Sequence, residues 1–137
     1  MRPIRSIIVH CSATPPDMDI GVETIDGWHR DRGWASIGYH YVIRRNGRVE
    51  TGRNIEHPGA HARGANQDSV GVCLVGGTDA DDKTKAEANF TLTQYRALEE
   101  LVWTLRGRYG SLEVMGHRDL PGVRKACPCF DVRCLFS

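Results

Sequence analysis

The chain has 137 residues, of which 40% are hydrophobic and 26% charged, and its formal net charge is +1. These values are typical of a globular protein the size of one domain and exclude a largely disordered chain. A near-neutral charge offers no basic stripe for nucleic acid, and no segment approaches the ~20 apolar residues of a membrane-spanning helix. We therefore expect one domain over residues 1–137 that binds no nucleic acid and does not associate stably with membranes.

The N-terminal segment lacks the pattern of a secretory signal. Arg2 and Arg5 precede only a short apolar run at residues 7–9, which His10 interrupts. We expect no signal peptide and synthesis in the cytoplasm, where thiols stay reduced. The five cysteines are accordingly expected to be core residues or metal ligands rather than disulfides.

The first half of the chain predicts three strands and one helix. Residues 4–10 form an apolar run that is typical of a buried strand and ends at a histidine. Residues 22–32 carry apolar side chains at helical spacing. Residues 38–44 alternate and are rich in β-forming residues, and an Asn-Gly dipeptide then predicts a hairpin whose return strand is residues 48–51.

The second half predicts two further strands and the longest helix. Residues 54–68 hold two histidines in a loop of a length that is usually functional. Residues 69–75 and 112–115 are expected to be strands, and residues 92–109 carry a helical apolar stripe. Residues 116–131 are expected to form a loop that runs to the C-terminus. Four or five strands with two long helices predict an α/β fold with a central mixed β-sheet flanked by helices.

The start of the second helix carries two further signals. Thr91 and Gln94 fit a capping box, and Phe90 with Tyr95 fits a hydrophobic staple. Gly110 is expected to end the helix.

Three residues that could bind a metal lie where strands give way to loops. His10 ends the first strand, His117 follows the last, and Cys127 lies in the tail. Strand ends are rigid supports, and the loops that leave them form the mouth of a cleft. Two imidazoles and a thiolate are the three protein ligands that a catalytic zinc keeps. Zinc also suits this donor set better than magnesium or calcium does.

Two further polar residues are candidates for work beside such a metal. Lys125 lies two residues before Cys127, and in an extended segment the two side chains share a face. Tyr39 opens the predicted second strand and is a second candidate. By alternation, Cys11 faces away from His10, and Cys73 is expected to be packing within its strand.

The residue types alone leave other interpretations open. The tail CPCFDVRC (127–134) could hold a small structural zinc by itself or simply pack. Alternatively, Cys127 and His117 could form the nucleophile and base of a cysteine hydrolase.

Six segments together resemble the amidase-2 superfamily. This group includes phage lysozymes that are amidases, cytosolic anhydromuropeptide amidases and animal peptidoglycan recognition proteins. The resemblance is strongest to the short phage amidases and covers nearly the whole chain. The segments are VHCSAT (9–14), GWHRDRGW (27–34), GYHYVIRRNGRVETGR (38–53), GAHARGANQDSVGVCLVGG (59–77), GHRD (116–119) and KACPCFD (125–131).

The resemblance implies a peptidoglycan-recognition-protein-like or phage-lysozyme-like domain that hydrolyses the amide between the lactyl group of N-acetylmuramic acid and L-alanine. It implies that the two histidines and the cysteine named above hold one zinc ion per chain. It also implies that Tyr39 and Lys125 are catalytic and that His61 contacts the substrate. Cys129 and Cys134 are not part of the family's ligand set.

For the biological setting, the resemblance implies a monomeric phage or prophage endolysin that acts on peptidoglycan in host lysis. Such a protein would leave the host cytoplasm through a holin-type pore to reach the periplasm and the cell wall. A cytosolic muropeptide-recycling amidase is an alternative, although those relatives carry aspartate where this chain has Cys127. A non-catalytic peptidoglycan-binding module is another. An RNA polymerase-regulating module is disfavoured because only six residues precede the apolar run.

Overall fold

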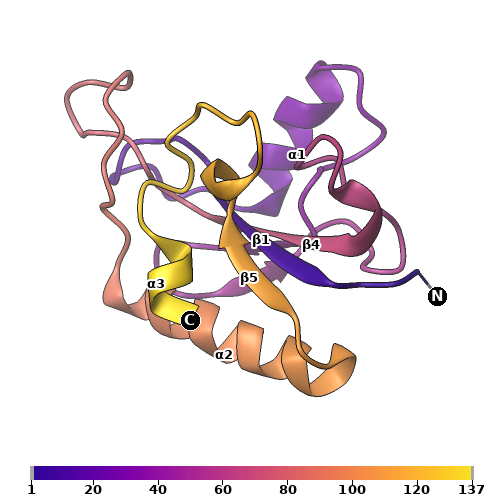
Figure 1. Cartoon of the computed structure of the whole chain (residues 1–137). Helices are drawn as coiled ribbons and strands as arrows, with labels where there is room; N and C mark the ends of the chain where they lie inside the picture. Colours follow the sequence, from indigo (N-terminus) through magenta and orange to yellow (C-terminus); the bar gives the residue numbers. More distant parts are fainter. Residues whose placement is uncertain (1, 137) are drawn as a thin grey trace.

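The apolar runs of the sequence form one central sheet in the computed structural model, which describes residues 2–136 (Figure 1). The sheet has five strands in the order β3-β2-β4-β1-β5, and every neighbouring pair is parallel except β2 with β3. The predicted mixed α/β architecture is therefore confirmed. The strands are β1 (Ser6–Cys11), β2 (Tyr41–Ile43), β3 (Val49–Thr51), β4 (Ser69–Leu74) and β5 (Glu113–Gly116).

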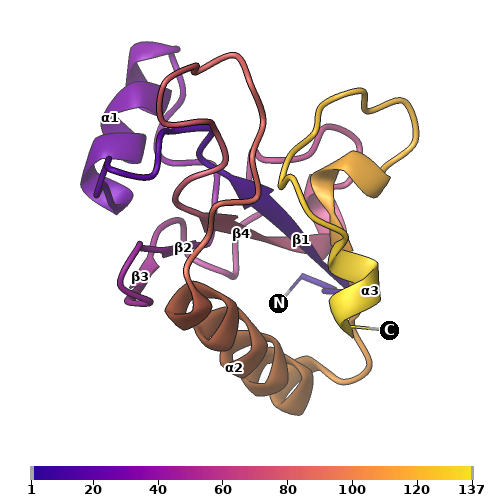
Figure 2. The ribbon, with the colours of Figure 1, turned by 90° about the vertical axis from the view of Figure 1, so that its left-hand side faces the viewer.

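Helices cover both faces of this sheet (Figure 2). They are α1 (Val22–Asp31), α2 (Leu92–Tyr109) and α3 (Val132–Phe136), with short 3₁₀ turns η1 (Asn66–Asp68) and η2 (His117–Asp119). Leu98 of α2 and Val132 of α3 join Val9 of β1 in one core cluster. On the opposite face, Ile25 of α1 packs with Val42 of β2. The sheet is thus the middle layer of three.

Several predicted ends shift by one or two residues, as in β1, which begins at Ser6 and ends at Cys11 rather than at His10. Two predictions about the chain's elements were wrong by more than that. The second strand begins at Tyr41 rather than at residue 38, because the backbone of Gly38 bonds to the His29 ring and to Ala60 instead of to the sheet. Tyr39 therefore precedes the strand. The C-terminal tail is not all loop, since Asp131 accepts a hydrogen bond from the Cys134 N–H and starts the short helix α3.

The local signals at the start of α2 are confirmed. Thr91 and Gln94 form the reciprocal capping box, and the rings of Phe90 and Tyr95 lie 6.1 Å apart. Gln94 is fully buried, and its amide also donates to the carbonyl oxygens of Ile43 (3.1 Å) and Val75 (2.9 Å). One side chain therefore joins α2 to the ends of β2 and β4.

Within residues 2–136, no helix combines the length and the apolar character that crossing a membrane requires.

We expect Gln94→Ala to lower the free energy of unfolding by about 2–4 kcal/mol, because it removes three side-chain hydrogen bonds, one from the Thr91 N–H and two to the buried carbonyl oxygens of Ile43 and Val75. Urea unfolding followed by circular dichroism measures this change. Arg96→Ala, on the exposed face of the same helix, is the control and should shift stability by less than about 0.5 kcal/mol. Equal effects of the two substitutions would contradict the bridging role.

Candidate active site

The parallel pairing of β1 with β5 brings the predicted ligands together. Val9 is paired with Gly116, so His10 of β1 and His117, the first residue after β5, lie next to each other at the same sheet edge. Their rings lie 4.6 Å apart. The donor atoms of His10, His117 and Cys127 all lie within 4.8 Å of one another. Donors that share one zinc at 2.0–2.3 Å lie within roughly 4 Å of each other, so this grouping fits such an ion.

The backbone of β1 holds the sulfur of Cys127 in place. The Cys11 N–H donates to Cys127 Sγ over 3.1 Å, and the Arg118 N–H donates to the Cys127 carbonyl oxygen over 2.8 Å. These two hydrogen bonds fix the sulfur and the backbone of Cys127. The irregular tail is therefore tied to β1, which carries His10, and to η2, which carries His117.

A chain of hydrogen bonds fixes the orientation of His10. Its Nε2 lies 2.8 Å from Nδ1 of His61, whose Nε2 lies 3.2 Å from the Ser69 hydroxyl. Ser69 donates its proton to the Ala65 carbonyl oxygen over 2.6 Å, so the hydroxyl accepts from His61 Nε2–H. His61 Nδ1 is then an acceptor and His10 Nε2–H its donor. This leaves Nδ1 of His10 without a proton and free to bind a metal.

Two β4 residues that were not predicted as functional support this chain of hydrogen bonds. Ser69 supplies the last hydroxyl, and a Cβ at Gly71 would lie only 2.5 Å from Cγ of His61. The loop that carries His61 is held by Asn66, whose side-chain oxygen accepts the N–H groups of His61 and Ala62, each over 2.9 Å. In the sequence both β4 positions look like ordinary parts of a buried strand.

The imidazoles of the site are held in their neutral form. Burial, and then repulsion from His61, His117 and Lys125, lower the pKa of His10 well below its ordinary value. Burial and the nearby Lys125 ammonium also lower the pKa of His117. Neutral imidazole is the form that coordinates a metal ion.

The two predicted catalytic residues have different surroundings. The Tyr39 ring lies 5.1 Å from that of His10, and burial raises the pKa of its phenol well above the ordinary value. Tyr39 thus keeps its proton at neutral pH and is a hydrogen-bond donor. Lys125 is exposed in the tail, close enough for its charge to affect both histidines.

An open cleft of about 740 Å³ lies beside His117 and includes three of the predicted site residues. His61, His117 and Lys125 line it, with Trp34 and the cationic side chains of Arg63 and Arg124. The His61 side chain is itself mostly buried. It therefore contributes to the cleft wall while bonded to His10 on its inner side.

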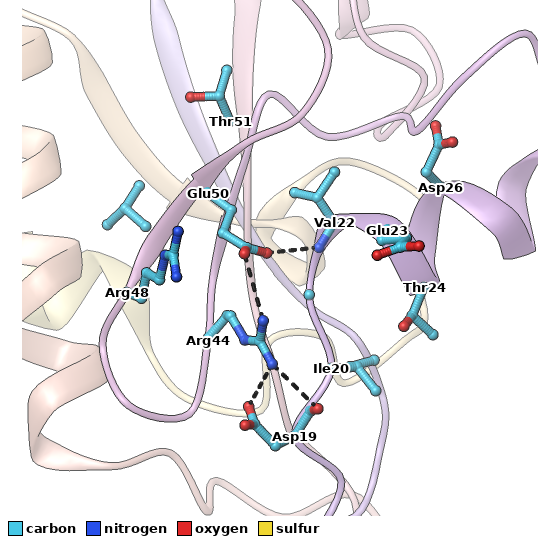
Figure 3. Close-up of a pocket in the computed structure, with 12 residues that line it drawn as sticks. Asp19, Ile20, Val22, Glu23, Thr24, Asp26, Arg44, Arg48, Glu50 and Thr51 are labelled. Carbon is cyan, nitrogen blue, oxygen red and sulfur yellow. Dashed lines mark hydrogen bonds and ion pairs between the residues drawn. The ribbon is translucent and has the colours of Figure 1, made fainter.

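A second pocket lies between the start of α1 and the β2–β3 hairpin (Figure 3). Arg44 pairs there with Asp19 and Glu50, and Glu50 also accepts the Val22 N–H over 2.9 Å. The charged groups at the centre of this pocket are therefore paired with one another, and Glu50 also accepts a backbone N–H from the first turn of α1. No predicted ligand or catalytic residue lines this pocket, so the cleft beside His117 is the candidate active site.

The sheet order, the helices on both faces and the His/His/Cys group define a mixed α/β domain with a candidate metal centre at the carboxyl edge of its sheet. The chain belongs to the family described as N-acetylmuramoyl-L-alanine amidase (Amidase_2), which matches residues 1–130. The resemblance that its motifs indicate is thereby confirmed.

Individual relatives agree with this assignment. The endolysin of Enterobacteria phage K11 is 50% identical over 125 residues, which cover 91% of this chain and 80% of the relative. The endolysin of Escherichia phage T7 is 46% identical over 128 residues, 93% of this chain and 82% of the relative. The solved structure of the N-acetylmuramoyl-L-alanine amidase LysC from Clostridium intestinale matches with a TM-score of 0.81 and 25% identity, covering 98% of this chain and 83% of that one. The family and these relatives support endolysin-type amidase function.

A buried histidine beside the site predicts a pH dependence of stability. His40 is fully buried; its Nδ1 accepts the Gly71 N–H and its Nε2 donates to the His57 carbonyl oxygen. Burial lowers its pKa from 6.5 to about 4. Between these values the unfolded chain binds more protons than the folded one, so stability falls as pH falls.

For the metal-free protein, we expect His40 to remove on the order of 3 kcal/mol of stability between pH 7 and pH 4. Denaturant unfolding at several pH values should show a shallower slope for His40→Gln than for the wild type. His57→Gln, at an exposed position, is the control and should keep the wild-type slope. An unchanged slope in His40→Gln would show that the buried ring is not kept neutral.

Proposed function

We propose that this protein is a zinc-dependent endolysin that hydrolyses the amide between the lactyl group of N-acetylmuramic acid and L-alanine. The observation that carries the proposal is the convergence of His10, His117 and Cys127 within 4.8 Å beside an open cleft. Three protein donors leave a fourth position for water or substrate, which distinguishes a catalytic zinc from a structural one. Family membership supplies the reaction and peptidoglycan as the substrate.

The donor set fits zinc chemically. The imidazoles are neutral, Nδ1 of His10 has no proton to lose, and the Cys127 sulfur accepts a backbone N–H. A zinc ion held by these residues would supply a Lewis acid for the scissile carbonyl and would acidify a water molecule.

The remaining roles belong to side chains that line the cleft and to Tyr39, whose ring lies beside that of His10. In the proposal, the Tyr39 phenol and the Lys125 ammonium donate to the oxygen on which negative charge develops during hydrolysis, and one of them protonates the departing amine of L-alanine. His61 lines the cleft against the substrate and also orients His10 through its Nδ1. The wall formed by Trp34 offers an apolar surface to the substrate beside these polar groups.

In the proposed setting the protein acts as a monomer on the host cell wall and leaves the cytoplasm through a holin-type pore. The similarity to phage endolysins supports release of the protein to the wall.

We expect substitution of any one ligand, as His10→Ala, His117→Ala or Cys127→Ala, to abolish zinc binding and hydrolysis together, because three ligands are the minimum set. Metal content of the purified protein and dye release from purified sacculi measure the two properties. In the wild type, chelation should remove both and added zinc should restore both. Activity that survives complete metal removal would contradict the zinc mechanism and favour a cysteine hydrolase.

We expect Tyr39→Phe and Lys125→Ala each to keep one zinc per chain and to lower turnover by roughly 10²–10³, the usual effect of removing one oxyanion donor. Steady-state hydrolysis of a soluble muropeptide and metal analysis of the same preparations test this. Lys83→Ala, in the exposed loop between β4 and α2, is the matched control and should retain full turnover. Full activity of Lys125→Ala would refute the proposed role of its ammonium.

A further inference from the structure

Two sulfur atoms that the proposed mechanism does not use lie side by side. Sγ of Cys11, at the end of β1, is 4.0 Å from Sγ of Cys129 in the tail, although the residues are 118 positions apart in the sequence. Both are free thiols in the structure. Cys11 is buried with 7% exposure, whereas Cys129 is partly exposed.

Nothing separates the two sulfurs because the residue beneath them has no side chain. Cys129 Sγ lies 3.3 Å from the Gly77 carbonyl oxygen, to which it donates. A Cβ at Gly77 would lie 2.7 Å from Cys11 Sγ and 3.6 Å from Cys129 Sγ. Bringing the sulfurs to bonding distance requires them to approach by about 2 Å. The tail between η2 and α3 contains no regular element to oppose that movement.

The neighbouring cysteine has a different environment. Cys127 Sγ accepts the Cys11 N–H and belongs to the group with His10 and His117. Pairing of Cys11 with Cys129 therefore leaves the candidate ligand sulfur untouched.

We propose that Cys11 and Cys129 form a disulfide when the protein meets an oxidising compartment. That compartment follows from the proposed function, since the space outside the cytoplasmic membrane is oxidising whereas the cytoplasm is reducing. The bond itself depends only on the two thiols and an oxidant.

The oxidant is a small or protein disulfide. The Cys129 thiolate attacks one of its sulfurs, forms a mixed disulfide and releases one thiol. The Cys11 thiolate then attacks Cys129 Sγ, forms the Cys11–Cys129 bond and displaces the second thiol. The protein thereby loses two protons and two electrons, which reduce the oxidant disulfide to two thiols.

The bond would join the segments that carry two of the three candidate ligands, because Cys11 follows His10 and Cys129 lies two residues after Cys127. It would also close a loop of 118 residues. A loop of that length is strongly constrained by a crosslink in the unfolded chain, so we expect the melting temperature to rise by roughly 10 °C on oxidation.

The test incubates the full-length zinc-loaded protein with oxidised glutathione and counts its free thiols. We expect two of the five thiols to be lost, with a mass decrease of about two hydrogen atoms and no retained glutathione. Trypsin leaves Cys127 and Cys129 on one peptide, ACPCFDVR (126–133), and Cys11 on another, residues 6–30. Fragment ions that separate Cys127 from Cys129 then identify the bonded sulfur.

Cys129→Ser should abolish both the crosslinked peptide and the rise in melting temperature. Cys134→Ser, which alters an exposed cysteine of the same tail, is the matched control and should change neither. Bonding of Cys11 to Cys127, or retention of all five thiols, would overturn the proposal. Hydrolysis of sacculi by the reduced protein, measured in parallel, tests the proposed function separately, because that activity does not require the bond.

Discussion

The parallel pairing of β1 with strands on both of its sides sets the positions of its neighbours and of the candidate site residues. β1 is bonded to β4 over its whole length and to β5 over four residue pairs. This register places His10 and His117 at one edge of the sheet, directly after a paired residue of each strand. A slip of one residue would turn the side chain of His10 to the opposite face, among the apolar side chains beneath α2. The buried strands and the candidate metal centre are therefore specified by the same pairing.

Buried imidazoles at that edge impose a second requirement. A charged histidine cannot be accommodated there without a large desolvation cost, and burial lowers the pKa of His10, His40 and His61. Neutral rings still need partners for both nitrogens. His61 finds them in His10 and Ser69, and His40 finds them in backbone groups. The same hydrogen bonds that make burial tolerable also select the tautomer of His10 that can coordinate a metal.

The tail completes the site from the least regular part of the chain. It carries both Lys125 and Cys127, and its approach is possible because Gly116 lacks a Cβ, which would lie 2.8 Å from Cδ of Pro128. Contacts with β1 and η2 replace the support that a strand or helix would give. This placement has a chemical consequence, since it brings a second tail sulfur, that of Cys129, beside Cys11.

Elements with local signals could be predicted from the amino-acid sequence. The bounds of α2, its capping box and its aromatic staple follow from neighbouring residues, and all are confirmed. The pattern of strand ends also identified His10, His117 and Cys127 as a group, because polar donors that follow buried strands converge at a sheet edge. Features that depend on distant partners could not be predicted and become visible in the folded chain. Examples are the capping of α1 by Glu50 of β3, the bonding of His61 to His10 and Ser69, and the proximity of Cys11 to Cys129. None of these contacts has a periodic or local signature, because each joins residues whose spacing along the chain bears no relation to their distance in the fold.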